Sequence, residues 1–183
     1  MTTYHLFRTV IIGALLALSP NAASAFSLDE VEQDVVSKYP SVTQLSTSTV
    51  ANVQATSKNV VLFDVREEDE FLVSHLPGAI RVDPDMSEAD FLKQYASMVQ
   101  GKQVVFYCSV GVRSSKLAGL VGEQLKAVGA VQTANMSGGI FRWHNEKRVL
   151  MSTSGKVDLV HPYNSKWGAL VDRKPKISYT PIP

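Results

Sequence analysis

The strongest chemical feature of the sequence is its single cysteine, which opens the segment Cys108–Ser115 (CSVGVRSS). This segment follows the apolar run Val104–Tyr107, typical of a buried strand, and precedes a helical pattern. A tight loop that enters a helix N-terminus turns several backbone N–H groups toward one point. Those donors and the positive end of the helix dipole lower the pKa of a thiol. The segment therefore predicts a nucleophilic thiolate in an anion-binding cup.

Two other residues of the segment support this prediction. Gly111 can adopt a positive φ, which would allow the loop to curl around the sulfur. Arg113 carries a permanent positive charge near the expected start of the helix. A thiol, a glycine and an arginine in this order are suited to covalent catalysis at a loop between a strand and a helix.

The elements that must position this loop alternate along the chain. Strands are predicted at 42–45, 60–63, 104–107 and 131–136, and helices from Leu28 to before Pro40 and at about 50–55, 88–99 and 114–128. This alternation at crossover lengths predicts an α/β domain with a mainly parallel sheet. Ligands of such sheets bind beyond the carboxyl ends of the strands. Cys108 and Asp64 each follow one of these strands.

Length, charge and cysteine count exclude several classes of protein. The chain has 183 residues, with 18 Lys and Arg against 17 Asp and Glu. This length suits one domain with one sizeable core, and the near-zero net charge argues against binding nucleic acid through a basic face. One cysteine excludes an intramolecular disulfide, a zinc site with two thiolates and an internal dithiol redox cycle.

Residues 1–25 predict a secretory signal peptide. His5 and Arg8 precede the short apolar run 10–18, and Ala23-Ser24-Ala25 has the A-x-A pattern of a cleavage site. The run is shorter than the ~20 residues of a membrane span. The alternatives are an uncleaved anchor and a buried helix. We expect cleavage after Ala25, a periplasmic or secreted mature chain, and no membrane association afterwards.

Four segments, in family order and at family spacing, resemble the rhodanese sulfurtransferases. They are the loop Cys108–Arg113 (C-x-x-G-x-R), Asp64–Phe71 (D-V-R-x-x-x-E-(F/Y)), His75–Ala79 (G-H-I-P-G-A, with Ser74 in place of the first Gly), and Gly138–Trp143 (G-G-(I/W)-x-x-W). Together they cover about residues 45–148. On the basis of these residues, the chain resembles a single-domain, exported member of the family.

The resemblance implies a fold and a division of the chain. The fold is α/β, with a central, mainly parallel sheet flanked by helices on both faces. We expect a signal peptide at 1–25, a rhodanese-like domain at 26–148, and a C-terminal extension at 149–183. This extension is expected to pack on the domain and to end in an extended tail from Lys174 that carries three prolines.

The resemblance also implies a reaction. The thiolate takes the outer sulfur of a donor, such as thiosulfate or a persulfide, and a persulfide remains on the cysteine. That sulfur then passes to a thiophilic acceptor such as cyanide, a thiol or a protein thiol. This double displacement requires no metal and no organic cofactor. The partners expected are therefore small sulfur compounds or protein thiols and not nucleic acid, and the oligomeric state is left open.

The resemblance assigns roles to individual residues. Cys108 is the nucleophile and persulfide carrier. The backbone N–H groups that hold the persulfide come from the loop, namely Ser109, Val110, Gly111, Val112, Arg113 and Ser114. Arg113 either contacts the anionic donor or braces the loop by pairing with a carboxylate. We favour bracing, with Asp64 as the partner, because both Asp64 and Cys108 end central strands.

Other residues near these motifs have simpler interpretations. Arg66 is expected to line the mouth of the site or to pair with an acid such as Glu70. His75 belongs to a shaped turn, so we expect it to bond loop backbone rather than act as a general base. The aromatic stretch from His161 to Gly168 is expected mainly to pack on the sheet edge, with shaping of the site mouth as the alternative.

Three other functions compete with sulfur transfer. Protein tyrosine phosphatases also use Cys, an anion cup and Arg, but they have five residues between Cys and Arg, where this loop has four, 109–112. A non-catalytic binding module, or a sulfur carrier that serves a partner protein, is the second. A thiol redox protein is the third. Positions 109, 110 and 112 are Ser, Val and Val, where thiosulfate-using rhodaneses often carry Lys or Arg. Sulfur transfer is therefore expected without efficient use of thiosulfate in particular.

Overall fold

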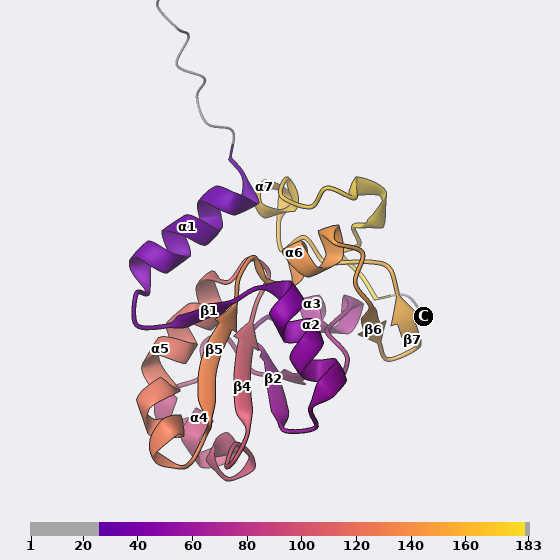
Figure 1. Cartoon of the computed structure of the whole chain (residues 1–183). Coiled ribbons are helices and arrows are strands. Elements are labelled where there is room, and N and C mark those ends of the chain that lie inside the picture. Colours follow the sequence, from indigo (N-terminus) through magenta and orange to yellow (C-terminus); the bar gives the residue numbers. More distant parts are fainter. Residues whose placement is uncertain (1–25, 182–183) are drawn as a thin grey trace, which may run out of the picture.

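The computed structural model of the chain describes residues 26–181. The expected signal peptide at 1–25 lies outside the described residues. Five parallel strands form a central sheet in the order β1-β5-β4-β2-β3 (Figure 1). They are β1 (Thr43–Leu45), β2 (Val60–Asp64), β3 (Ile80–Arg81), β4 (Gln103–Tyr107) and β5 (Gln132–Met136). The predicted α/β fold with a parallel sheet is confirmed.

Helices cover both faces of the sheet (Figure 1). Helices α1 (Leu28–Lys38), α2 (Thr47–Thr56) and α6 (Gly139–Asn145) pack with one hydrophobic core, and α4 (Glu88–Tyr95) and α5 (Val112–Ala127) pack with the other. Successive side chains of a strand point to opposite faces of its sheet. Leu62 of β2 accordingly joins the first core and Phe63 the second. The continuous apolar strands are thus explained by burial on both faces.

Serine side chains cap the first turns of three helices. Ser27 caps α1 in a capping box, in which the Glu30 N–H donates to the Ser27 Oγ at 3.2 Å. Ser46 and Ser87 cap α2 and α4 in the same way through a side-chain oxygen. Three helix bounds differ from expectation, and one of them is the start of α2, at Thr47 rather than near 50. Helix α5 begins at Val112 rather than near 114, and α4 ends at Tyr95, where the 3₁₀ turn η1 (Ala96–Met98) follows.

The elements that were not predicted include two short ones near the site. Helix α3 (Glu68–Val73) has six residues, and β3 has two. Neither is long enough to show a hydrophobic period, so only tertiary contacts reveal them. Helix α3 carries Glu70 toward the cysteine loop, and β3 extends the sheet beyond β2.

The extension after residue 148 contributes to the first core. It contains the hairpin strands β6 (Leu150–Ser152) and β7 (Gly155–Val157), helix α7 (Ser165–Gly168) and the 3₁₀ turn η2 (Lys174–Lys176). Leu150, Val160, Leu170 and Val171 are buried within that core. The tail from Lys174 was predicted to be extended, but Lys174–Lys176 forms the 3₁₀ turn η2. In residues 26–181 no helix has the length and apolar character required to cross a membrane.

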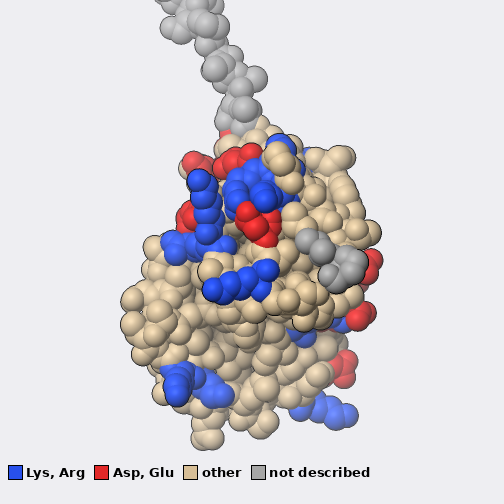
Figure 2. Space-filling model, turned by 90° about the vertical axis from the view of Figure 1, so that its right-hand side faces the viewer, with Lys and Arg blue, Asp and Glu red and all other residues tan. Residues whose placement is uncertain are grey.

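Charged side chains tie the extension together on one side of the molecule. Figure 2 views the side on which β6 and β7 lie and shows Lys and Arg gathered with Asp and Glu over its upper part. Within the extension, Asp158 pairs with Arg173 at 2.5 Å and with Lys176 at 3.5 Å. These groups are largely exposed, so each pair contributes at most about 1 kcal/mol.

Candidate active site

Cys108 follows β4 at the carboxyl end of the sheet and is 1% exposed. Its Sγ accepts a hydrogen bond from the Gly111 N–H at 3.2 Å. Burial by itself raises the pKa of the thiol. The positive charge of Arg113, together with donors from Ser114 and the Val110 N–H, outweighs burial, so the pKa lies below its ordinary value. The loop therefore shifts the pKa of the thiol in the direction that the sequence predicted, and the role of Cys108 as nucleophile stays a prediction.

Gly111 occupies a position that requires glycine. Its φ is +98°, and a Cβ there would lie 3.1 Å from the Asn135 amide nitrogen. Asn135 is itself held by Ser114, whose hydroxyl donates to the Asn135 Oδ1 at 2.6 Å. The backbone turns sharply here and enters α5 at Val112. The predicted positive φ of Gly111 is confirmed.

The turn between β5 and α6 holds the cysteine loop from the other side. The Ile140 N–H donates to the Cys108 carbonyl at 2.9 Å, and the Phe141 N–H donates to the Ser109 carbonyl at 3.0 Å. Gly139 makes this close approach possible, since a Cβ on it would lie 2.3 Å from the Cys108 carbonyl oxygen. The Gly138–Trp143 motif thus acts by fixing the backbone of the loop.

Arg113 braces the loop, but its partner is Glu70 and not Asp64. Its Nη1 and Nη2 donate to the two Glu70 carboxylate oxygens at 2.8 and 2.9 Å. The Ser109 hydroxyl completes the cluster by donating to Glu70 Oε1 at 2.7 Å and accepting from Arg113 Nη2 at 3.0 Å. Burial raises the pKa of Glu70, and the bonds and charge of Arg113 bring it below its ordinary value. Glu70 is therefore ionised and satisfied.

The predicted role of Asp64 toward Arg113 is wrong because Asp64 is already paired with Arg66. The Arg66 Nε and Nη2 donate to the Asp64 carboxylate at 2.7 and 2.6 Å, and Nη2 also donates to the Ser74 carbonyl at 2.6 Å. Both side chains are fully buried. Arg66 therefore neither lines the mouth of the site nor pairs with Glu70. Asp64 is thus neutralised by an arginine two residues along the chain, and Arg113 pairs with Glu70 instead.

His75 has the structural role expected for it. Its Nδ1 lies 3.1 Å from the Phe71 carbonyl oxygen, and its ring stacks on the Phe71 ring with centroids 4.0 Å apart. Its backbone exchanges two hydrogen bonds with Met151 at 2.9 Å. The turn thus connects α3 to the extension.

A cavity of about 190 Å³ lies above the cysteine loop. It is lined by Cys108, Ser109, Val110, Val112, Arg113, Tyr163 and Trp167. The last two residues belong to the extension. The sequence interpretation that favoured simple packing for them is incomplete, because they form part of the mouth of the site. The alternative given for this stretch, shaping of the site mouth, is the one that fits Tyr163 and Trp167.

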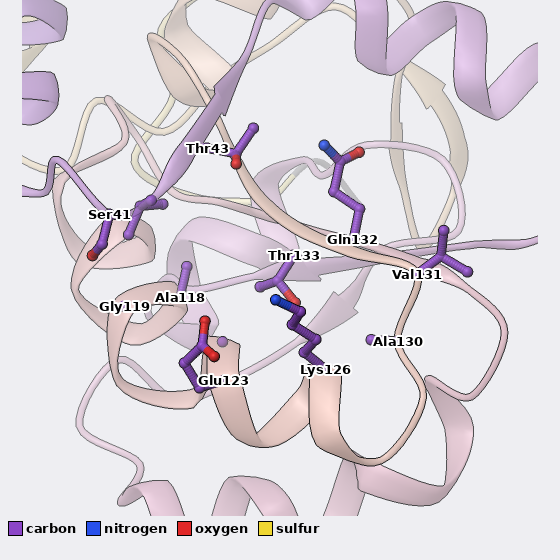
Figure 3. Close-up of a pocket in the computed structure, with 12 residues that line it drawn as sticks. Ser41, Thr43, Ala118, Gly119, Glu123, Lys126, Ala130, Val131, Gln132 and Thr133 are labelled. Carbon is purple, nitrogen blue, oxygen red and sulfur yellow. The ribbon is translucent and has the colours of Figure 1, made fainter.

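A separate hollow of about 270 Å³ lies away from the cysteine loop (Figure 3). Its walls come from the start of β1 and the residues before it, from one side of α5 and from the start of β5, including Thr43, Gly119, Lys126 and Gln132. The start of β5 is the opposite end of that strand from Met136, which leads toward the cysteine loop. Residues 26–181 contain no group of three His, Cys, Asp or Glu side chains placed to hold a metal ion.

The fold and site together define a parallel α/β domain with a cysteine loop at the carboxyl end of its sheet. The rhodanese-like domain family matches residues 47–146, and the chain belongs to that family. The tRNA uridine(34) hydroxylase of Oceanobacillus iheyensis is 31% identical over 96 residues, which cover 50% of this chain and 28% of that protein. The enzyme of the same name from Staphylococcus haemolyticus is 35% identical over 77 residues, 39% of this chain and 23% of that protein.

Two solved structures share the fold. A protein from Bacillus halodurans aligns over 78% of this chain and 98% of its own, with a TM-score of 0.52 and 16% identity. The thiosulfate sulfurtransferase of Pseudomonas aeruginosa aligns over 68% of this chain and 22% of its own, with a TM-score of 0.52 and 18% identity. The chain spans less than a third of the length of the curated relatives it matches.

Replacing Glu70 with Gln tests the bracing pair. The change leaves a half-buried guanidinium without its carboxylate, so the free energy of unfolding should fall on the order of 3 kcal/mol in urea denaturation. Glu67→Gln is the matched control, since its carboxylate is 54% exposed and lies 4.0 Å from the same guanidinium. That variant should stay within about 0.5 kcal/mol of the parent. Equal losses in the two variants would contradict the assignment.

Gly139→Ala should displace the cysteine loop. Its Cβ would collide with the carbonyl oxygens of Cys108 and Ser109, and the loss of unfolding free energy should reach about 3 kcal/mol or more. The control is Gly78→Ala, where φ is +72° but nothing lies within 4 Å, so strain alone costs about 1 kcal/mol. Alkylation of Cys108 should accelerate only in the first variant. Similar behaviour of both would show that the close approach is not needed.

Proposed function

We propose that the protein is a rhodanese-type sulfurtransferase that carries sulfur as a persulfide on Cys108. The observation that carries the proposal is the placement of this thiol. It is buried at the carboxyl end of a central strand, accepts the Gly111 N–H at 3.2 Å, and lies in a loop braced by Arg113. A thiol held as a thiolate among N–H donors can both attack sulfur and stabilise the anionic product.

The proposed reaction is a double displacement. The Cys108 thiolate attacks the outer sulfur of the donor and forms a new S–S bond. The bond between the donor's two sulfur atoms breaks, and its electron pair leaves with sulfite when the donor is thiosulfate, or with a thiolate when it is a persulfide. The terminal sulfur then passes to cyanide, a thiol or a protein thiol, and the Cys108 thiolate is regenerated. Atoms and charges balance without a metal or an organic cofactor.

The hydroxylase activity named for the curated relatives is not transferred to this chain. The aligned segments make up 28% or less of those proteins. The experiments below also distinguish sulfur transfer from two other functions. A partner-serving carrier would form the persulfide but turn over slowly with small acceptors. A phosphatase is disfavoured by the four residues, 109–112, between Cys108 and Arg113.

Mass spectrometry after exposure to a donor tests the proposal directly. The parent protein should gain the mass of one sulfur atom on Cys108 and lose it on addition of cyanide. Cys108→Ser should gain none and should unfold at the same denaturant concentration as the parent, because a hydroxyl cannot form a persulfide. If the serine variant retained parental sulfur transfer, the mechanism would be wrong. Phosphate release from an aryl phosphate would instead favour the phosphatase.

We also propose export with cleavage before Phe26. The structure is compatible with this boundary, since the Phe26 ring packs on the Trp167 ring with centroids 5.5 Å apart and α1 begins at Leu28. N-terminal sequencing of the protein from its native host should therefore begin at Phe26. Recovery of a chain that begins at Met1 or Thr2 would reject the proposal.

A further inference from the structure

The segment His161–Gly168 places two aromatic rings at the mouth of the site. Tyr163 and Trp167 line the same cavity as Cys108, and both lie outside the matched residues 47–146. We propose that these rings make the site selective for sulfur donors that carry an apolar, preferably aromatic, group on the sulfur atom bonded to the transferred sulfur. This inference rests on the proposed function and names its substrate class.

The segment is held in place by its own contacts. Val160 exchanges backbone hydrogen bonds with the tail, from its N–H to Lys176 at 3.0 Å and from Ser178 to its carbonyl at 3.1 Å. Asn164 caps α7 by accepting the Trp167 N–H at 3.0 Å. Gly168 packs so closely that a Cβ there would lie 2.8 Å from the Pro162 side chain. The aromatic rings are therefore presented by an ordered segment.

Tyr163 adopts an unusual backbone conformation in order to reach the site. Its φ is +63°, and Lys147 is the only other non-glycine residue with a positive φ within residues 26–181. Such strain in a bulky residue persists where the surrounding structure enforces it, and it concentrates at functional sites. The His161 Nδ1 accepts the Tyr163 N–H at 3.0 Å and helps to hold this turn.

The Tyr163 ring also covers the guanidinium of Arg113. The Arg113 Cζ lies 4.9 Å from the ring centroid, and the same guanidinium donates twice to Glu70. Its charge is thus neutralised by one partner and covered by another. A small dianion such as thiosulfate gains little from a cation that is already paired and covered. A second carboxylate, that of Glu67, lies 4.0 Å from the same guanidinium.

The remaining lining favours an apolar group. Val110 and Val112 contribute aliphatic surface to the cavity that Cys108 lines, and Trp167 contributes its indole ring. Phe26 packs on Trp167, with ring centroids 5.5 Å apart, and supports that ring. A cavity of about 190 Å³ is large enough for a benzene-sized group. An aryl group of a donor can therefore occupy this cavity while the outer sulfur of that donor reaches Cys108.

The chemical step for such a donor is the one already proposed. With an aryl thiosulfonate, the Cys108 thiolate attacks the outer sulfur and forms an S–S bond. The original bond between the two sulfur atoms breaks, and the aryl sulfinate leaves with the electron pair. With an aryl or alkyl persulfide, the leaving group is the corresponding thiolate. No oxidant or reductant is consumed in either case.

The test compares two donors of equal charge, benzenethiosulfonate and methanethiosulfonate. The measured quantity is the ratio of their second-order rate constants for persulfide formation on the full-length mature protein. We expect the double variant Tyr163→Asn, Trp167→Ala to lower this ratio about tenfold, which corresponds to ~1.4 kcal/mol of lost apolar contact. Asparagine is chosen at position 163 because it tolerates a positive φ. Taking the ratio of the two donors cancels any loss of general reactivity.

Two control variants refine the comparison. Tyr163→Phe keeps the ring and should keep the parental ratio. Val131→Ala changes an exposed apolar side chain at the separate hollow of Figure 3 and should also leave the ratio unchanged. An unchanged ratio in the double variant, with persulfide still formed, would overturn the aromatic selectivity and leave the proposed sulfur transfer intact.

Ligand binding to a variant that cannot react tests the ligand class independently of the proposed sulfur transfer. Cys108→Ser cannot form a persulfide, so calorimetric titration reports affinity alone. It should bind benzenethiosulfonate more tightly than methanethiosulfonate, and the double change at 163 and 167 should abolish that preference. If the parent formed no persulfide with any donor but this preference were present, the proposed function would fail and the ligand class would stand. Equal affinities for the two donors would overturn the ligand class.

Discussion

A carboxylate that is almost entirely removed from water needs a cation beside it, and in this protein Glu70 at 1% exposure is paired with Arg113. This pair joins α3 to the first turn of α5 across the cysteine loop. The Ser109 hydroxyl bonds both partners, so the residue after the thiol is held by the same cluster. The geometry around Cys108 depends on this interaction, because the loop has no regular secondary structure of its own.

Two glycines and a buried network complete the support of the loop. Gly111 lets the chain turn back on the sulfur, and Gly139 lets the start of α6 approach the loop carbonyls. Below them, the Asp64–Arg66 pair is fully buried and fixes the carbonyl of Ser74. The Glu70–Arg113 pair and the Asp64–Arg66 pair therefore stabilise different parts of the site. One braces the loop, and the other fixes the turn that leads toward His75.

The extension changes what the site presents to solvent. The domain supplies the thiol, the N–H donors and the brace, whereas Tyr163 and Trp167 supply the aromatic wall of the cavity. Because Tyr163 lies over the guanidinium of Arg113, one side chain both covers the cation and forms part of the apolar surface. The family and fold are thus shared with other rhodanese-like proteins, and the proposed selectivity comes from residues outside the matched segment.

Local patterns in the sequence determined the parallel α/β class, the helix caps, the placement of Cys108 after a central strand and the need for glycine at 111. These features depend on periodicity, capping and φ preference, which are properties of neighbouring residues. Only the tertiary structure decided that Arg113 pairs with Glu70 and that Asp64 pairs with Arg66, since several acids were equally near in sequence. The same holds for Tyr163 and Trp167. A contact such as that of Arg113 with Glu70, 43 positions away, depends on how the elements pack, and no local pattern records it.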